Sequence, residues 1–303
     1  MPVSQISQFI RTGDTFTPHK HERYLLSMMQ TSNTAKGREN MYGSAAAFCP
    51  RLNFAYNKLT NIEVDTSPES VLYMSIGSGI ELALSNSLFA KDRLFFSNLR
   101  LPRADPYVSG KIDLVYLDEQ DEIIIGEVKS CGRLPAQPKY SHMQQLLTYL
   151  AFGGYKKGKL IYISRNVSDG RRTLIRVFDA DNSKPSMLKI LSKVCYTQFA
   201  IDANLMPGIP ADFKKSLHCG YCQFAEACWR TDPLSSPEDD PFRAFTKVDK
   251  ASHAALLDRA KERARELYAT SDVRYVTSLR HIYDNIKSED LKSRLMDEVV
   301  RYE

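Results

Sequence analysis

Two carboxylates and a lysine lie inside an otherwise apolar stretch, GKIDLVYLDEQDEIIIGEVKS, at residues 110–130. Asp113 precedes the acidic centre of this stretch, and Glu127 and Lys129 follow it. If a turn is centred near Gln120, residues equidistant from it face each other in a hairpin. Asp113 and Glu127 then become cross-strand neighbours, with Cβ atoms about 4.5–5.5 Å apart. Lys129 lies two residues beyond Glu127 and is expected on the same face.

Such a pair of carboxylates is suited to metal chemistry. Facing carboxylates between apolar strands repel each other, and removing them from water is costly. A divalent cation between them offsets both costs, and oxygen ligands suit Mg²⁺ or Mn²⁺. A metal-bound water could attack a phosphate, with Lys129 orienting that water or stabilising the transition state. The alternative is a solvated face whose charges serve solubility, but Val115, Ile123 and Ile125 make the expected face mostly apolar.

The pattern Asp113…Glu127-x-Lys129 resembles the PD-(D/E)XK nuclease superfamily, in which the acidic pair binds metal and the lysine is catalytic. Gln145 and Tyr149 form a QxxxY element on the helix expected after the hairpin. In the RecB-like branch such an element contributes to the active site and to DNA contact. Without the resemblance, the two residues are a solvated glutamine and a tyrosine that packs on the core. The resemblance implies that all five residues are catalytic.

The helix expected before the hairpin carries GSGIE at residues 77–81. RecB-like nucleases often have a GxxxH element there, whose histidine helps to hold metal. Glu81 stands where that histidine would fall, and a glutamate is an adequate ligand for Mg²⁺ or Mn²⁺. The alternative is a surface glutamate on an amphipathic helix. The resemblance implies a metal site formed by Glu81, Asp113, Glu127 and Val128.

Cysteines form a second constellation, with Cys219, Cys222 and Cys228 in a CxxC-x5-C pattern and Cys49 far upstream. A CxxC turn lets two thiolates reach one metal centre, and four thiolates suit zinc as well as iron. One cysteine before the core motifs and three after them resembles the iron–sulfur nucleases, including the CRISPR-associated RecB-like exonucleases and the AddB nuclease domain. The resemblance implies a [4Fe-4S] cluster that ties residue 49 to residues 219–228. Zinc remains the alternative.

The surrounding sequence predicts the elements that position these residues. Ser67 can cap a helix with Pro68 in its first turn, and Gly153-Gly154 ends a later helix. Helices are expected at residues 44–58, 67–89, 140–152, 185–204 and from 247 onward, and strands at 93–101, 159–165 and 173–179 besides the hairpin. This order predicts an α/β fold with a mixed sheet. The resemblance specifies a restriction-endonuclease-like core with a central mixed β-sheet flanked by helices, an iron–sulfur cluster subdomain and a helical C-terminal extension.

The chain is expected to divide into four parts. Residues 44–230 carry the motifs of the RecB-like nuclease domain, closed by the four cysteines, and residues 1–43 precede it as an extension. Residues 231–246 are polar and proline-rich and predict a linker. Residues 247–303 predict a helical extension.

Composition leaves a nucleic-acid partner open. The 303 residues include 41 Lys and Arg against 36 Asp and Glu, a net charge of +5 that permits DNA binding without requiring it. No apolar run approaches the roughly 18 residues that span a bilayer, and the first residues do not form a secretory signal, so a soluble cytoplasmic protein is expected.

Basic residues expected to contact phosphate are Arg51, Lys111, Lys139, Lys156, Lys157, Lys159, Arg171 and Arg172. Tyr149, Phe152 and Tyr155 are expected to stack on bases.

These observations together predict a metal-dependent DNA exonuclease that uses Mg²⁺ or Mn²⁺. By family analogy it would act on single strands or ends with 5′ to 3′ polarity, in recombination, replication or repair, phage DNA metabolism or CRISPR adaptation. The sequence has no GxxxxGK[ST] motif, so unwinding would come from a helicase or a recombination or integration partner. The alternatives are an endonuclease, a relative that acts on RNA, and a DNA-binding or assembly factor whose nuclease fold is only structural.

Overall fold

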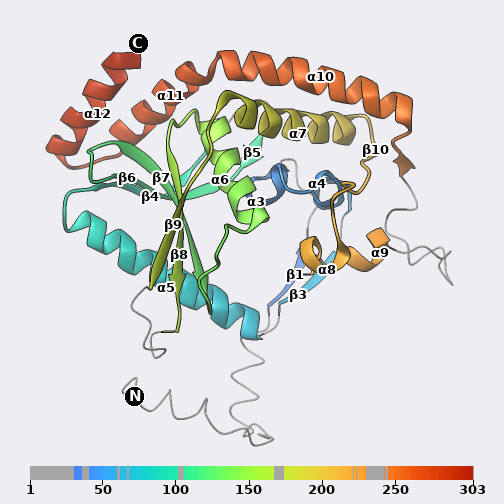
Figure 1. Ribbon diagram of the computed structural model, residues 1–303, viewed down its shortest axis with the longest axis horizontal. Helices are drawn as coiled ribbons and strands as arrows, with labels where there is room; N and C mark the ends of the chain where they lie inside the picture. Colours follow the sequence, from blue (N-terminus) through green and yellow to red (C-terminus); the bar gives the residue numbers. More distant parts are fainter. Residues whose placement is uncertain are drawn as a thin grey trace, which may run out of the picture.

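The computed structural model describes residues 31–35, 41–59, 62–66, 68–101, 106–166, 174–220, 222, 224–229, 242 and 245–302. Its centre is a five-stranded sheet with the order β4-β6-β7-β8-β9 (Figure 1). Strands β7 and β8 are parallel and the other neighbours are antiparallel, so the sheet is mixed, as predicted. The strands are β4 (Leu94–Arg100), β6 (Lys111–Leu117), β7 (Ile123–Cys131), β8 (Gly158–Ser164) and β9 (Ile175–Asp179).

Helices cover both faces of this sheet. On one face, α5 (Pro68–Phe89) packs Leu84 and Leu88 against a small apolar cluster of the strands. On the other face, α6 (Tyr140–Gly153) and α7 (Lys184–Asp202) contribute to the main core. The predicted mixed sheet flanked by helices is therefore confirmed.

The C-terminal helices join the main core. They are α10 (Lys250–Ala269), α11 (Ser271–Tyr283) and α12 (Glu289–Tyr302). Helix α10 lies along α7 and buries Leu256, Ala260, Ala264 and Leu267 there (Figure 1). The division of the chain into domains stays a prediction, and most of the expected linker at 231–246 lies outside the described residues.

Short elements complete the description. Three two-stranded pairings join β1 (Thr31–Ala35) to β3 (Ile62–Thr66), β2 (Met41–Tyr42) to β5 (Val108–Ser109), and β10 (Leu205–Met206) to β11 (Thr246–Lys247). The short helices are α3 (Gly43–Ala46), α4 (Pro50–Lys58), α8 (Lys215–His218) and α9 (Ala225–Trp229). The single helix expected at 44–58 is thus two, because Pro50 cannot donate a helical hydrogen bond and instead begins α4.

The hairpin has the predicted register. Leu114 pairs with Gly126 and Leu117 with Ile123, which places the turn at Gln120. The Asp118 carboxylate accepts the backbone N–H groups of Gln120 and Glu122, each at 3.0 Å, and closes the turn.

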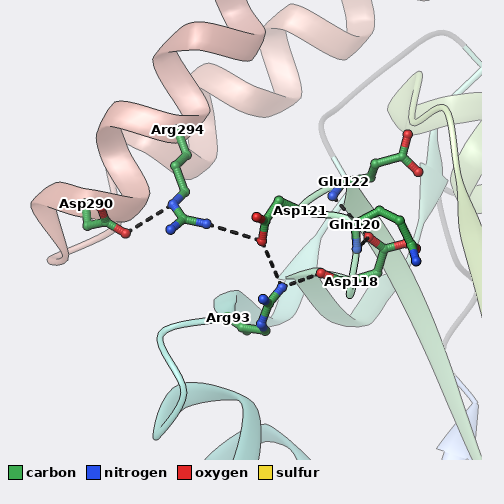
Figure 2. A network of polar contacts seen from close by, with 7 residues as sticks. All are labelled: Arg93, Asp118, Gln120, Asp121, Glu122, Asp290 and Arg294. Atoms are coloured by element: carbon green, nitrogen blue, oxygen red, sulfur yellow. Dashed lines mark hydrogen bonds and ion pairs between the residues drawn. The ribbon is translucent and has the colours of Figure 1, made fainter.

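Figure 2 shows that this turn is also tied to the C-terminal helix α12. Arg294 of α12 contacts Asp121 at 3.3 Å and Asp290 at 3.1 Å. Arg93 contacts Asp121 at 2.9 Å and donates to the carbonyl of Asp118. The end of the hairpin opposite to Asp113 and Glu127 is thereby fixed to the rest of the protein.

Helix α6 ends where the sequence predicts. Gly154 has a φ of 72°, the left-handed conformation that glycine adopts without steric cost. A Cβ at this position would lie 2.5 Å from both the carbonyl oxygen of Ser271 and the backbone nitrogen of Tyr275. Gly154 therefore both ends α6 and lets α11 approach it. In the described part of the chain, no helix is long and apolar enough to cross a membrane.

Candidate active site

Asp113 and Glu127 lie at the point where the paired part of β6 and β7 ends. The last pair is Leu114 with Gly126, and beyond it the backbone N–H of Val128 donates to Oδ2 of Asp113 at 2.7 Å. Both carboxylates line a pocket with a volume of about 680 Å³. The other predicted site residues that line the same pocket are Glu81, Val128, Lys129, Gln145 and Tyr149.

Glu127 is the most unusual group in this pocket. It is 1% exposed, and its Oε1 lies 2.6 Å from Nζ of Lys129. Its Oε2 is buried and has no hydrogen-bond partner among the described residues. Burial raises the pKa of Glu127 to about 8, with Lys129 opposing the shift and Asp113 adding to it. Burial also raises the pKa of Asp113 to about 6.

A chain of side chains holds Lys129. Its Nζ donates to Oε1 of Gln145 at 3.1 Å, and Nε2 of Gln145 donates to the hydroxyl of Tyr149 at 2.9 Å. Gln145 and Tyr149 are four residues apart and therefore share one face of α6. Burial lowers the pKa of Lys129, but pairing with Glu127 and Asp113 outweighs it and raises that pKa, so the lysine stays charged.

Tyr149 occupies a slot made by two glycines. Its side chain is 3% exposed. A Cβ on Gly43 or on Gly110 would lie 2.6 Å from Cε1 of its ring. Neither position has room for a side chain, so these glycines let the tyrosine ring pass close to the backbone.

Glu81 reaches the pocket from α5 and is held by Asn98, which our reading of the sequence missed. Asn98 donates to Oε1 of Glu81 at 2.8 Å and accepts from Nζ of Lys111 at 2.8 Å. The register of β4 and β6 places Asn98 opposite Asp113. Its φ of 57° is left-handed, a region in which asparagine is one of the few tolerated side chains. An amide inside the strand sequence LFFSNLR is the signal that could have identified it.

The donor set fits a hard divalent cation. Glu81 and Asp113 each raise the pKa of Glu127 further, which places three carboxylates near one another, and one buried carboxylate oxygen lacks a partner. Oxygen donors of this kind are those that Mg²⁺ and Mn²⁺ prefer, with waters completing the coordination. Among the described residues, however, no three His, Cys, Asp or Glu side chains form a ready coordination sphere. The individual metal and catalytic roles remain predictions.

The structure brings Cys49 close to the downstream cysteine segment. Cys49 is the residue before α4, and burial raises the pKa of its thiol to about 11, with Cys222 and Cys228 adding to the shift. Burial raises the pKa of Cys228 to about 11 as well. The indole nitrogen of Trp229 lies 3.4 Å from Sγ of Cys219. The described cysteines are not arranged as a metal site, so the iron–sulfur subdomain and its zinc alternative are not established by this geometry.

Some expected DNA contacts are wrong or used elsewhere. Tyr149, Phe152 and Tyr155 are buried, at 3%, 2% and 4% exposure, and cannot stack on bases. Arg51 donates to the carbonyl of Pro207 at 2.8 Å, away from the pocket. The remaining basic residues differ in position. Lys111 lines the pocket and donates to Asn98, and Lys139 is exposed directly before α6. Ion pairs join Lys156 to Asp272, Lys157 to Glu122 and Lys159 to Asp179, and residues 171 and 172 lie outside the described part of the chain.

Comparisons with known proteins agree with the site. The family model for the PD-(D/E)XK nuclease superfamily matches residues 55–229, from within α4 to the end of α9. No curated protein gives a match. Among solved structures, the chain is similar to one titled "Crystal structure of SSO0001", with 16% sequence identity and a TM-score of 0.42, over 72% of this chain and 99% of that chain. The family match covers more than half of the 303 residues and includes every acidic residue of the pocket. The chain therefore belongs to the PD-(D/E)XK nuclease superfamily.

Proposed function

We propose that the protein is a metal-dependent DNA exonuclease that hydrolyses single strands or strand ends, with 5′ to 3′ polarity. The observation that carries this proposal is Glu127, a buried carboxylate with one unpartnered oxygen beside Asp113 and a charged lysine. A carboxylate in this state costs folding free energy unless a cation joins it. Members of the superfamily generally use Mg²⁺ or Mn²⁺.

The residues of the pocket have separate tasks in this proposal. Asp113, Glu127 and Glu81 hold the metal, and Val128 contributes only through its backbone, since its side chain packs on the apolar cluster under α5. The bound cation supplies an acidified water and neutralises charge on the phosphate. Lys129 has three N–H donors, of which Glu127 and Gln145 take two. The third is left for the attacking water or for a phosphate oxygen.

Gln145 and Tyr149 position that lysine, since Gln145 accepts from its Nζ and donates to the buried Tyr149 hydroxyl. Lys111 also lines the pocket. It uses one of its three N–H donors on Asn98, and the others can contact a phosphate of the strand. Phosphate contacts of this kind position a strand without reading its sequence.

The test is degradation of end-labelled single-stranded DNA by the parent and by Lys129→Ala, with Mg²⁺ or Mn²⁺. Label placed at the 5′ or the 3′ end reports polarity, and circular DNA and RNA serve as the substrates of the alternative readings. Lys287→Ala, an exposed lysine between α11 and α12, is the matched control. Metal-dependent loss of label in the parent and the control, but not in Lys129→Ala, is expected. Cleavage of circles would indicate an endonuclease, and inert folded parent protein on every substrate would leave a binding or assembly role.

We infer that Cys49, Cys219, Cys222 and Cys228 hold a [4Fe-4S] cluster, with zinc as the alternative. The proposal is supported by the family resemblance and by the approach of Cys49 to the other thiols. Ionised thiolates are unfavourable at this depth of burial without a metal. Iron, sulfide and zinc should be measured in anaerobically purified parent protein, in Cys222→Ser and in Cys131→Ser as the control. Iron and sulfide should be lost only in Cys222→Ser, and a parent protein with neither metal would contradict the proposal.

A further inference from the structure

A second pocket, with a volume of about 720 Å³, lies between α7 and α10 and shares no residue with the active site. Helix α7 presents Lys189, Lys193 and Tyr196 to it, and α10 presents His253 and Lys261. The two helices lie side by side in Figure 1. Their facing side chains and the loop at 208–211 form the walls. The volume lies in the range of known small-molecule sites.

The lining of this pocket is strongly cationic. Four lysines contribute to it, Lys189, Lys193, Lys250 and Lys261, against the single carboxylate of Asp249. That carboxylate accepts the backbone N–H of Ser252 at 2.7 Å and keeps its charge, so it offsets one of the four lysines. The lining therefore has an excess of positive charge that an anionic ligand would neutralise.

Two of these lysines have fixed positions. Lys193 donates to the hydroxyl of Tyr140 at 2.7 Å and to the carbonyl of Ala47 at 3.3 Å, which leaves one of its three N–H donors for a ligand. Lys261 pairs with Asp258 at 3.1 Å. Lys189 and Lys250 are both exposed. Their ammonium groups are thus able to adjust to a phosphate.

Between the lysines the walls are apolar and aromatic. Ile209, Pro210 and Leu257 line the pocket, and Tyr196 packs edge-on against His253 with their ring centroids 5.2 Å apart. The Tyr196 hydroxyl is joined to Nδ1 of His253 at 2.9 Å, which holds the imidazole in place. An apolar floor with one oriented ring suits a flat base, whereas an acidic peptide would leave it without a partner.

We propose that this pocket binds a nucleoside phosphate, with the lysines on the phosphate and the apolar floor against the base. The ligand is either a nucleotide within a single strand or a free nucleotide. The inference does not depend on hydrolysis at the other pocket. If the protein is the proposed exonuclease, the pocket is a second contact for the strand. The segment from Gly43 to Pro50 contributes to both pockets, through Gly43 to the active site and through Pro50 to this one.

The test is binding of a 5′-phosphorylated thymidine dinucleotide with a 3′ fluorophore, followed by anisotropy in EDTA, so that no divalent cation is present. The variant is Lys189→Ala with Lys250→Ala, and the control is Lys91→Ala with Lys287→Ala, which removes the same charge from exposed sites elsewhere. We expect the Kd to rise at least about tenfold in the first pair and to stay within about twofold in the control. The dependence of log Kd on log salt should become shallower in the first pair, because two lysine–phosphate contacts are lost. The variant Lys189→Arg with Lys250→Arg keeps both positive charges and should therefore keep the affinity for the dinucleotide.

Further ligands separate the possible sources of binding. An abasic dinucleotide and inorganic tripolyphosphate should compete at least about tenfold more weakly than the parent dinucleotide. A 12-nucleotide strand that loses affinity in the same variant assigns the site to a strand, and loss with the dinucleotide alone assigns it to a free nucleotide. Equal binding by the Lys189→Ala, Lys250→Ala protein, or equal competition by tripolyphosphate, would overturn the proposal. Because hydrolysis is absent in EDTA, failure of the nuclease proposal would leave this result unchanged.

Discussion

Glu127 makes the stability of the metal-free protein depend on pH. Its pKa of about 8 exceeds the ordinary value of 4.5, so the folded state holds a proton that the unfolded state releases. The contribution of this carboxyl is fully present below about pH 4.5 and is lost as the pH rises through 8. Asp113 acts in the same direction between its ordinary 3.8 and about 6. Since one pKa unit corresponds to about 1.4 kcal/mol, the combined loss is on the order of several kcal/mol.

We therefore expect the thermal midpoint in EDTA to fall between about pH 5 and about pH 8.5, and to fall less in Glu127→Gln. At about pH 8, Mg²⁺ should raise the midpoint of the parent protein and leave that of the variant nearly unchanged, since only the parent has the carboxylate that the cation stabilises. Differential scanning fluorimetry measures both effects. If the thermal midpoints of the two proteins fell equally with pH, ionisation of Glu127 would not destabilise the folded state and the prediction would be wrong.

Asn98 provides a prediction on metal affinity at the same scale. Asn98→Gly keeps the left-handed backbone but removes the amide between Glu81 and Lys111. Loss of such a supporting group typically costs about 10–100-fold in metal affinity or activity. We expect Mn²⁺ binding, followed by electron paramagnetic resonance, to weaken about tenfold. Asn98→Ala should weaken it similarly and also destabilise the fold by about 1 kcal/mol, because alanine is disfavoured at positive φ. Unchanged Mn²⁺ binding in both variants would remove Asn98 from the site.

At the scale of elements, the position of Lys129 depends on close packing between α6 and Gly110, the residue between β5 and β6. The Tyr149 ring lies against Gly110, and its hydroxyl holds Gln145, which in turn holds Lys129. In Gly110→Ala the new Cβ would lie 2.6 Å from that ring, so the ring must move away from Gln145. We expect a loss of about 1–3 kcal/mol in unfolding free energy and reduced nuclease activity. Gly79→Ala on α5 is the control, since a Cβ there meets nothing within 4 Å and alanine favours a helix. Chemical denaturation measures the unfolding free energy of both variants. Equal stability of Gly110→Ala and Gly79→Ala would contradict the close packing of Tyr149 on Gly110.

For the whole molecule, the C-terminal helices contact both the β6–β7 hairpin and the end of α6. Arg274 and Ser278 of α11 donate to the carbonyls of Ala151 and Gly153 at the end of α6, at 3.1 and 2.8 Å. Arg294 of α12 reaches the hairpin turn at Asp121 (Figure 2). The C-terminal helices therefore contact two places at once: the C-terminal end of α6 and the turn of the β6–β7 hairpin.

We expect removal of residues 250–303 to leave α7 with an exposed apolar face and to yield aggregated or non-cooperatively unfolding protein. Arg294→Ala should cost less than about 1 kcal/mol, because its ion pairs are exposed to solvent. Gel filtration and denaturant unfolding distinguish these outcomes. A truncated protein that unfolds cooperatively at the midpoint of the parent would show that the helices are an independent extension.

Local sequence determined the elements of this protein and the chemistry of its site. Two apolar runs around an acidic turn centred at Gln120 predicted the hairpin register, and Gly154 ended α6 where predicted, because such signals act between neighbouring residues. Asp113, Glu127 and Lys129 were recognisable for the same reason. Tyr155 was misread, since it is buried against Tyr275 of α11, more than a hundred residues away.

Only the tertiary structure decided the contacts between distant segments. It brought Asn98 to Glu81, Cys49 toward Cys228, and α10 onto α7. Each of these meetings depends on the summed packing of many side chains, which no single stretch of sequence specifies. The amino-acid sequence by itself therefore determined the nuclease motif and its register, whereas burial around Glu127 and the lysine-lined pocket arose from how the helices close on the sheet.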